Sequence, residues 1–235
     1  MQTIRLKREK RPYEVNEELK LLRTNLLFCG ADKHVFLMTS AFAGEGKSTV
    51  TLDLCLSLAE LGKNVILIDA DMRKSMLKHR IVGPQPENGL SHYLSGQCQL
   101  DDVVCQTDVE QLYAVLAGAV PPNPTELLSS EQMKRLISFC REHFDYVVID
   151  CPPIGLVVDP AVIAPLCDGT MLLIEANQVK YRLAQESTAK MKATGCPILG
   201  VILNKVSEKK FGRYYTKYYG KRYYKAYYAH SENKS

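Results

Sequence analysis

The stretch from Ala41 to Thr49 carries the residue types that bind a polyphosphate. It reads A-F-A-G-E-G-K-S-T, which meets the pattern G-x-x-x-x-G-K-[ST] except that Ala41 stands at the first glycine position. An apolar run at 35–39 precedes it, as expected of a buried strand. A helical pattern follows it with one apolar face: Val50, Leu54, Leu58 and Leu61. A turn between a strand and a helix directs backbone N–H groups and the helix dipole at an anion, so the sequence predicts a nucleotide phosphate site.

The polar residues of this loop have separate expected parts in holding ATP and magnesium. The predicted ATP-binding residues of the loop are Gly44, Glu45, Gly46, Lys47, Ser48 and Thr49. Lys47 is expected to reach the β- and γ-phosphates, and the Ser48 hydroxyl to ligate magnesium. Thr49 is expected beside the α-phosphate. The alternative is a glycine-rich turn with a surface lysine.

Two further apolar runs end in carboxylates. One reads V-I-L-I-D-A-D-M-R at 65–73, and the other reads V-V-I-D-C-P-P at 147–153. Ligands of open α/β sheets bind outside the carboxyl ends of the strands, so Asp69, Asp71 and Asp150 are expected to gather around one magnesium ion and the γ-phosphate. The alternative is a set of turn or capping aspartates. Arg73 is expected to pair with phosphate or with a neighbouring carboxylate, and Asn204, after the last predicted strand, to contact adenine.

The elements that must position these residues alternate along the chain. Strands are expected at 35–39, 64–69, 111–116, 146–150, 170–175 and 198–203. Helices are expected at 14–29, after the phosphate loop, from Thr125, along the stripe from Met133 to Phe144 and at 181–194, with short ones near 89–94 and 101–104. Strands without polar alternation are typical of a buried parallel sheet. The predicted fold is α/β, a P-loop-NTPase-like, mostly parallel sheet with helices on both faces.

Composition limits the remaining possibilities. The net charge is only +4, but basic residues crowd both ends, which predicts a disordered basic arm at 1–13, a P-loop domain at 14–206 and a flexible tail at 207–235. No apolar run reaches the roughly 18 to 20 residues of a membrane helix, and the basic start lacks the apolar core of a secretory signal. Eight cysteines without a C-x-x-C pair favour reduced thiols in the cytoplasm, and five histidines show no metal-ligand spacing.

The tail is unusual because eight of the thirteen tyrosines lie there as four adjacent pairs. They are Tyr214, Tyr215, Tyr218, Tyr219, Tyr223, Tyr224, Tyr227 and Tyr228. Seven cationic side chains and no acidic one lie between Lys209 and Tyr228. Such a segment could stack on single-stranded nucleic acid or lie on an anionic membrane. The interpretation favoured here is a cluster of phosphate acceptors for a nearby ATP site.

With the D-x-D-x-R run as the second of three motifs, the chain resembles the bacterial tyrosine kinases. In particular it resembles the soluble cytoplasmic kinases of Gram-positive capsular or exopolysaccharide synthesis, and the resemblance covers nearly the whole chain. Glu17-x-x-Lys20-x-x-Arg23 is similar to the family's oligomerisation motif E-x-x-R-x-x-R, with Lys20 in place of the first arginine, and its helical spacing is expected to offer one charged face to an adjacent subunit. The run P-P-N-P-T-E-L-L at 121–128 and the tyrosine cluster resemble two further hallmarks. The related partitioning and division-site ATPases carry a signature lysine where this chain has Phe42.

The resemblance implies a function and a set of partners. Lys47, Asp69, Asp71 and Asp150 would be catalytic, with Asp69 and Asp150 in the magnesium shell and Asp71 receiving the tyrosine hydroxyl. The kinase would use ATP and Mg2+ to phosphorylate its own tail in trans within a ring, an octamer by resemblance. A membrane activator of the chain-length-regulator type would recruit it from the cytoplasm to the inner face of the membrane. A protein-tyrosine phosphatase would reverse the reaction, and no nucleic acid is expected. The alternatives are a partitioning-type ATPase and a nucleotide-dependent interaction module without kinase activity.

Overall fold

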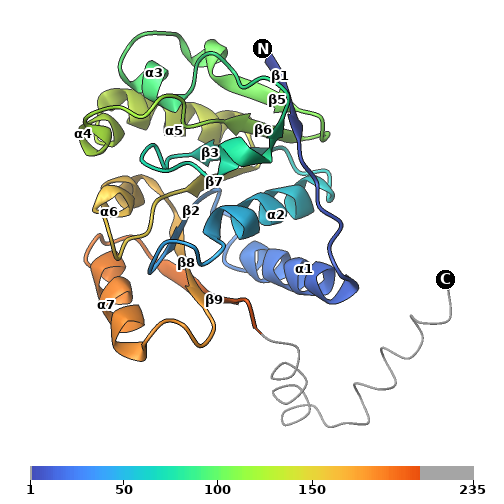
Figure 1. Cartoon of the computed structure of the whole chain (residues 1–235), viewed down its shortest axis with the longest axis vertical. Coiled ribbons are helices and arrows are strands. Elements are labelled where there is room, and N and C mark those ends of the chain that lie inside the picture. Colours follow the sequence, from blue (N-terminus) through green and yellow to red (C-terminus); the bar gives the residue numbers. More distant parts are fainter. Residues whose placement is uncertain (1, 207–235) are drawn as a thin grey trace, which may run out of the picture.

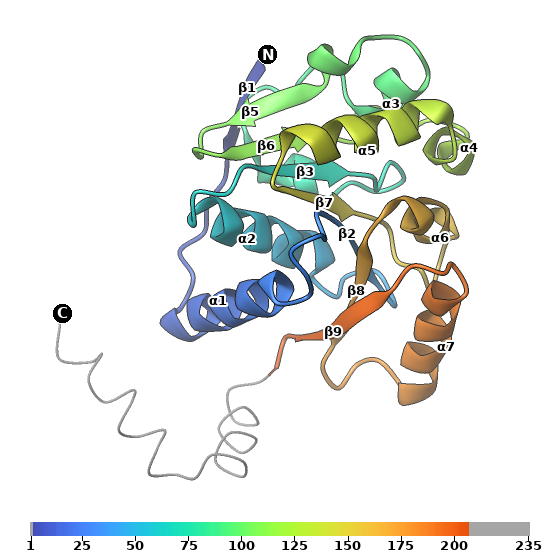
Figure 2. The same cartoon turned by 180° about the vertical axis from the view of Figure 1, so that it is seen from behind.

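The computed structural model describes residues 2–206, which form one sheet covered by helices on both faces (Figure 1, Figure 2). The strands are β1 (Gln2–Leu6), β2 (Val35–Ser40), β3 (Val65–Asp69), β4 (Ile81–Val82), β5 (Val104–Thr107), β6 (Leu112–Val115), β7 (Tyr146–Asp150), β8 (Gly169–Glu175) and β9 (Ile198–Asn204). Their order is β4-β1-β5-β6-β3-β7-β2-β8-β9. The strands from β6 to β9 in that order are all parallel. The predicted fold class is confirmed.

The helices divide between the two faces. They are α1 (Tyr13–Leu27), α2 (Lys47–Ala59), α3 (Leu90–Leu94), α4 (Pro124–Leu128), α5 (Glu131–His143), α6 (Asp159–Ile163) and α7 (Tyr181–Lys192), with short 3-10 turns at Leu77–Arg80, Leu100–Asp102 and Ala164–Leu166. One apolar cluster joins α1 and α2 to side chains such as Phe36 and Met38. The other apolar cluster contains Val35 and Leu37 together with residues of the helices from α3 through α7. Neighbouring residues of β2 thus enter opposite layers, which is why the strands show no polar alternation.

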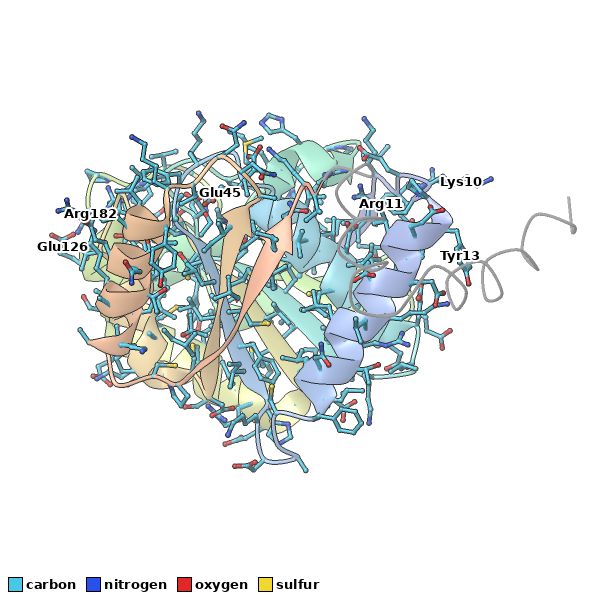
Figure 3. The ribbon with its side chains drawn as sticks, turned by 90° about the horizontal axis from the view of Figure 1, so that it is seen from below. Lys10, Arg11, Tyr13, Glu45, Glu126 and Arg182 are labelled. Carbon is cyan, nitrogen blue, oxygen red and sulfur yellow. The ribbon has the colours of Figure 1, made fainter. Side chains whose placement is uncertain are left out.

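The amino-terminal arm differs from the sequence prediction. Residues 2–6 are not disordered: β1 pairs in parallel with β5 and antiparallel with β4. Ile4 and Leu6 are buried while Arg5 between them is exposed, so this strand does alternate. Residues 7–12 then lead to α1, and Figure 3 labels Arg11 just before that helix. Arg11 makes an ion pair of 2.9 Å with Asp53 of α2.

Other differences lie at the edges of the elements. Strands β4 and β5 and helix α6 were not predicted, and the helix expected at 101–104 is a 3-10 turn followed by β5. Helix α2 ends at Ala59, so Leu61 lies beyond it and is exposed. Along α1, Leu26 is buried but Val15 is 40% exposed, because only the second half of the helix packs on the sheet layer. In the part of the chain that the structure describes, no helix has the length and apolar character needed to cross a membrane.

Candidate active site

The phosphate loop connects β2 to α2 with two glycines in left-handed conformations. Gly44 has φ +86° and Gly46 has φ +92°, values that a residue with a side chain adopts only with strain. A Cβ atom on Gly46 would also collide with the Asn204 amide. Helix α2 begins at Lys47, so the first N–H groups of the helix have no partner within the helix itself and are available to an anion.

Glu45 braces this loop instead of facing a ligand. One carboxylate oxygen accepts a 2.6 Å hydrogen bond from the Phe42 N–H, and the other accepts one of 2.9 Å from the Glu175 N–H. The side-chain amide of Asn204 donates to the Glu45 carbonyl at 2.8 Å. Glu45 is 3% exposed; its side chain fixes the loop to the end of β8, and its backbone carbonyl connects the loop to the end of β9 (Figure 3). The Glu45 side chain is therefore engaged within the protein; a part of Glu45 in ATP binding stays a prediction, as does the adenine contact of Asn204.

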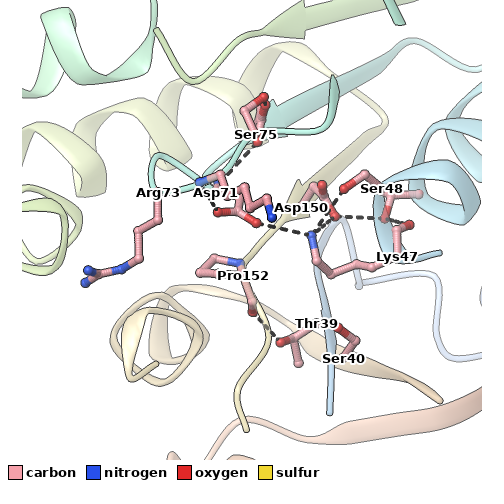
Figure 4. A network of polar contacts seen from close by, with 12 residues as sticks. Thr39, Ser40, Lys47, Ser48, Asp71, Arg73, Ser75, Asp150 and Pro152 are labelled. Atoms are coloured by element: carbon pink, nitrogen blue, oxygen red, sulfur yellow. Dashed lines mark hydrogen bonds and ion pairs between the residues drawn. The ribbon is translucent and has the colours of Figure 1, made fainter. Parts of the chain in front are cut away.

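The predicted catalytic residues meet at the carboxyl ends of β3 and β7. These strands are neighbours, and Asp69 lies directly opposite Asp150 in their register. The Lys47 ammonium nitrogen lies 2.8 Å from Asp150 Oδ1 and 3.9 Å from Asp71 Oδ2 (Figure 4). Thr51 of α2 also donates to Asp150 Oδ1, at 3.2 Å. The three aspartates and the lysine are thus brought together as the sequence predicted.

The charges in this cluster are not balanced, since one buried ammonium faces three carboxylates. Burial, with the neighbouring Asp150, raises the pKa of Asp69 to about 7. Burial also raises the pKa of Asp71, although Lys47 opposes the shift. Burial alone would lower the pKa of Lys47, but Asp150 and Asp71 raise it above its ordinary value. An additional cation would therefore be favoured here.

The donor set fits a magnesium ion held jointly with a nucleotide. Asp150 Oδ2 is buried and has no hydrogen-bond partner, which leaves a hard oxygen available. Within residues 2–206, no group of three or more His, Cys, Asp or Glu side chains is arranged to hold a metal without other ligands. Mg2+ ordinarily completes its octahedron with substrate phosphates and water, so a partial protein shell is what it requires.

Comparison with known proteins identifies the family. A family model described as an AAA domain matches residues 34–183. The tyrosine-protein kinase CpsD of Streptococcus agalactiae serotype Ia is 43% identical over 195 residues, which are 83% of this chain and 84% of that protein. The tyrosine-protein kinase YwqD of Bacillus subtilis is 32% identical, over 85% of this chain and 84% of its own. The chain belongs to the bacterial tyrosine kinase family.

Solved structures agree with this assignment. The kinase domain of the Escherichia coli tyrosine kinase ETK matches with a TM-score of 0.79 at 30% identity, covering 83% of this chain and 76% of that chain. The septum site-determining protein MinD of Pyrococcus horikoshii OT3, solved with Mg-ADP, matches with a TM-score of 0.63 at 24% identity, over 75% and 72% of the two chains, and shares the fold. The chain is thus a protein-tyrosine kinase of the bacterial type, in the group associated with Gram-positive capsule synthesis, as the motifs indicated.

Arg73 of this kinase pairs with a carboxylate, one of the two alternatives that the sequence left open. Its Nε donates to Asp159 Oδ2 at 2.7 Å, and its Nη2 donates to Asp159 Oδ1 at 3.0 Å. Figure 4 shows the guanidinium directed away from Lys47. A contact between Arg73 and ATP stays a prediction.

Residues of the loop's end have partners that the sequence did not reveal. The Thr49 hydroxyl accepts a 2.9 Å hydrogen bond from Arg80, a residue of the 3-10 turn at Leu77–Arg80. Ser48 Oγ accepts one of 3.3 Å from the Lys47 ammonium. Arg80 also pairs with Glu9, so it connects the amino-terminal segment to the phosphate loop. No motif marks Arg80, because its partners are remote in sequence.

The predicted oligomerisation residues do not share one outward face. Lys20 and Glu17 pair with each other on the surface of α1 at 2.7 Å. Arg23 instead donates to the carbonyl and the hydroxyl of Ser57, at 2.8 and 3.1 Å, and so lies against α2 of its own chain. The expectation of a single charged face is wrong for Arg23, because α1 and α2 pack side by side. The part of these residues in assembly stays a prediction, and the eight tail tyrosines lie outside the described residues.

Proposed function

We propose that this kinase uses ATP and magnesium to phosphorylate the tyrosine cluster of its own tail. The observation that supports this most is the meeting of Lys47, Asp71 and Asp150 beside the phosphate loop, at the carboxyl edge of the sheet. The sequence supplies acceptors in quantity, because eight tyrosines follow the domain within residues 207–235. Seven cations accompany those tyrosines, which suits a site with an excess of carboxylates.

In the proposed reaction, residues of the chain position the reacting groups and neutralise the charge on the phosphates. The bond between the γ-phosphorus and the β,γ-bridging oxygen of ATP breaks as a bond to the tyrosine oxygen forms, and ADP leaves. Lys47 turns from Asp150 to the phosphates and offsets their charge. Ser48, Asp69 and Asp150 would hold magnesium, which would supply further charge neutralisation. Asp71 orients the tyrosine hydroxyl and accepts its proton late, since a phenol of pKa about 10 is a far weaker acid than a carboxylic acid.

Replacement of all eight tail tyrosines by Phe tests the acceptor assignment. Incubation with labelled ATP and magnesium, with and without an activator, should give no phosphotyrosine in this variant while ATP binding remains. Wild-type protein should be labelled in the tail. Release of phosphate without phosphotyrosine in the wild type would favour the partitioning-type ATPase. ATP binding without any turnover would favour an interaction module.

The proposal extends to assembly and location. Transfer occurs in trans within a ring of subunits, an octamer by family resemblance, with Glu17, Lys20 and Arg23 contributing to the contacts. A membrane protein of the chain-length-regulator type activates the cytoplasmic kinase at the inner face of the membrane, and a protein-tyrosine phosphatase restores the tail. The cycle regulates capsular or exopolysaccharide synthesis and export.

Phosphorylation would also reverse the charge of the tail. The stretch from Lys209 to Tyr228 has seven cations and no acidic residue, hence a charge of +7. Eight phosphotyrosines would add about −12 to −16 near neutral pH, and the tail would then be repelled from an acidic, ATP-loaded site. Light scattering at low salt should show larger assemblies for the unphosphorylated protein and the eight-fold Phe variant than for the phosphorylated protein. Equal masses for all three would contradict this switch.

A further inference from the structure

Asp159, at the start of α6, is a buried carboxylate with a full set of donors. Its side chain is 1% exposed. It accepts hydrogen bonds from Arg73 Nε at 2.7 Å, from Arg73 Nη2 at 3.0 Å and from the Thr125 hydroxyl at 2.7 Å. Burial alone would raise the pKa of Asp159, but the hydrogen bonds from Arg73 and Thr125 lower it. This carboxylate is therefore ionised and committed to its partners.

Thr125 is the shared member of this group. Its hydroxyl donates to Asp159 and accepts a 2.9 Å hydrogen bond from Arg73 Nη2. It lies in the P-P-N-P-T-E-L-L run, at the second residue of α4, and the function proposed above gives that run no part. Three segments that are remote in sequence thus meet at one point: the loop after β3, the start of α4 and the start of α6. Figure 1 shows α4 and α6 on the same side of the sheet as this loop.

The segment that Arg73 belongs to carries Asp71 and is held mainly by side chains. Asp69 Oδ1 accepts a 3.2 Å hydrogen bond from the Asp71 N–H, and Asp71 Oδ1 accepts one of 3.0 Å from the Lys74 N–H. Residues 70–76 form neither a helix nor a strand. The Ala70 N–H still donates to the Asp150 carbonyl at 2.9 Å, but residues 71–76 have no ladder of backbone hydrogen bonds to fix their path. The bidentate pair between Arg73 and Asp159 ties the middle of this segment to a fixed helix.

We propose that Asp159 and Thr125 are positioning residues for the kinase reaction. Together they hold the Arg73 guanidinium, and through it they keep the Asp71 carboxylate beside Lys47, where the tyrosine hydroxyl must arrive. The proposal rests on the role proposed above for Asp71. It gives the P-P-N-P-T-E-L-L run a place in catalysis without contact to ATP or tyrosine. A small displacement of such a group can cost about 10²-fold in rate.

A purely structural role would have other consequences. If the network only joined α4 to α6, its loss would lower stability and reduce every activity of the folded protein in parallel. If it positions Asp71, its loss lowers kcat for phosphotyrosine formation while the affinity for nucleotide, which the loop from Gly44 to Thr49 holds, stays unchanged. The two cases can be distinguished because only a positioning role lowers kcat without lowering the nucleotide affinity.

The matched variants Thr125→Val and Thr125→Ser make the measurement. Valine keeps the shape of threonine and removes the hydroxyl, whereas serine keeps the hydroxyl. In the full-length protein, Thr125→Val should lower kcat about five- to tenfold, with the Kd for ADP and magnesium within twofold of wild type, and Thr125→Ser should retain most of kcat. Asp159→Asn should give the same pattern with a larger loss. Wild-type kcat in Thr125→Val, or parallel losses of kcat, nucleotide affinity and melting temperature, would overturn the proposal.

The double variant Asp71→Asn/Thr125→Val locates the effect. If Thr125 acts through Asp71, then Thr125→Val should reduce the residual rate of Asp71→Asn by less than twofold. If the loss in the double variant equals the product of the two single losses, Thr125 acts independently of Asp71. That result would refute the positioning role but would not contradict the proposed function. If Asp71→Asn by itself transferred at the wild-type rate, the role proposed for Asp71 would be wrong, and the positioning role with it.

Discussion

The aspartates at the two ends of the central sheet differ in how many hydrogen-bond donors and cations surround them. At the carboxyl end, Asp69, Asp71 and Asp150 share a single ammonium, that of Lys47, and burial raises the pKa of Asp69 and Asp71. At the amino end, Asp168 precedes β8 and accepts hydrogen bonds of 2.8 Å from the N–H groups of both His34 and Val35, and of 2.7 Å from Arg141. Burial alone would raise the pKa of Asp168, but Arg141 and the two backbone groups lower it.

This difference separates charge that stabilises the fold from charge kept for a ligand. A carboxylate with a complete set of donors lowers the free energy of the folded chain. A cluster with too few cations raises it and is relieved by a bound cation, as strongly shifted pKa values at functional sites generally indicate. The comparison predicts that changes at the carboxyl end affect activity most, and changes at the amino end affect stability most.

The largest effect is expected from Lys47→Met. Loss of the ammonium that neutralises the phosphates should lower phosphotyrosine formation by about 10² to 10³. Arg141→Met, which removes a cation at the amino end, should leave the rate per folded molecule within about twofold. Quantitative phosphotyrosine detection at saturating ATP makes the comparison. A loss of tenfold or less in Lys47→Met would contradict the predicted difference between the two ends of the sheet.

Next in size is the loss of stability in Asp168→Ala. Two backbone N–H groups at the start of β2 would lose their acceptor, which costs about 2 kcal/mol of unfolding free energy. Urea unfolding should detect this, while kinase activity below the transition stays normal. Exposed Asp101 provides the control, because Asp101→Ala should change stability by less than about 0.5 kcal/mol. Equal stability of the two variants would show that the amino-end network is not stabilising.

Stabilisation by magnesium should also differ between variants at the two ends, with a smaller change in unfolding free energy. With ADP present, magnesium at ten times its Kd should stabilise the wild type by about 1.4 kcal/mol. Asp168→Ala should keep this increment, whereas Asp150→Asn should lose most of it because the free buried oxygen belongs to that carboxylate. Thermal unfolding with and without magnesium measures it. An undiminished increment in Asp150→Asn would remove Asp150 from the metal shell.

A further difference lies in the pH dependence of stability without nucleotide or metal, where the contributions of the two ends should change in opposite directions with pH. The folded-state pKa of Asp69 is raised to about 7, so its contribution relative to Asp69→Asn is fully present below about pH 4 and is lost as pH rises through 7. The folded-state pKa of Asp168 is lowered. Its contribution relative to Asp168→Ala is therefore present above about pH 4 and is lost as pH falls further. Urea titrations of the two pairs across pH test this, and slopes of the same sign would refute it.

Much of the site could be predicted because its signals are local. Gly44, Gly46 and Lys47 are a contiguous run whose chemistry depends on a strand before it and a helix after it. Asp69 and Asp150 each follow an apolar run, and parallel strands place such ends at one edge of the sheet. Burial on both faces explains why β2, β3 and β7 are apolar along most of their length, which made these strands predictable from the sequence.

What could not be predicted depends on partners remote in sequence. Residues 2–6 were taken as a disordered arm because five basic residues crowd the first eleven positions, yet the strand β5 that β1 pairs with lies about a hundred residues away and had not been recognised. Arg23 was placed on an outward face because helical spacing gives an angle around α1 and not the position of α2. The pattern of neighbouring residues in the sequence could not have revealed either error, because the packing partners are remote in the chain.

The phosphate-loop motif, the carboxylates at the strand ends, the fold class and the kinase family could all be inferred from the amino-acid sequence, since each signal comes from short runs of neighbouring residues. The pairing of charges could be seen only in the folded chain. Folding joined Arg73 to Asp159 and Thr125, bound Asp168 to Arg141 and the start of β2, and left Asp150 with a free buried oxygen. The physical reason is that the strength of a charge interaction depends on distance and burial, and both are set by the packing of elements that the sequence keeps far apart.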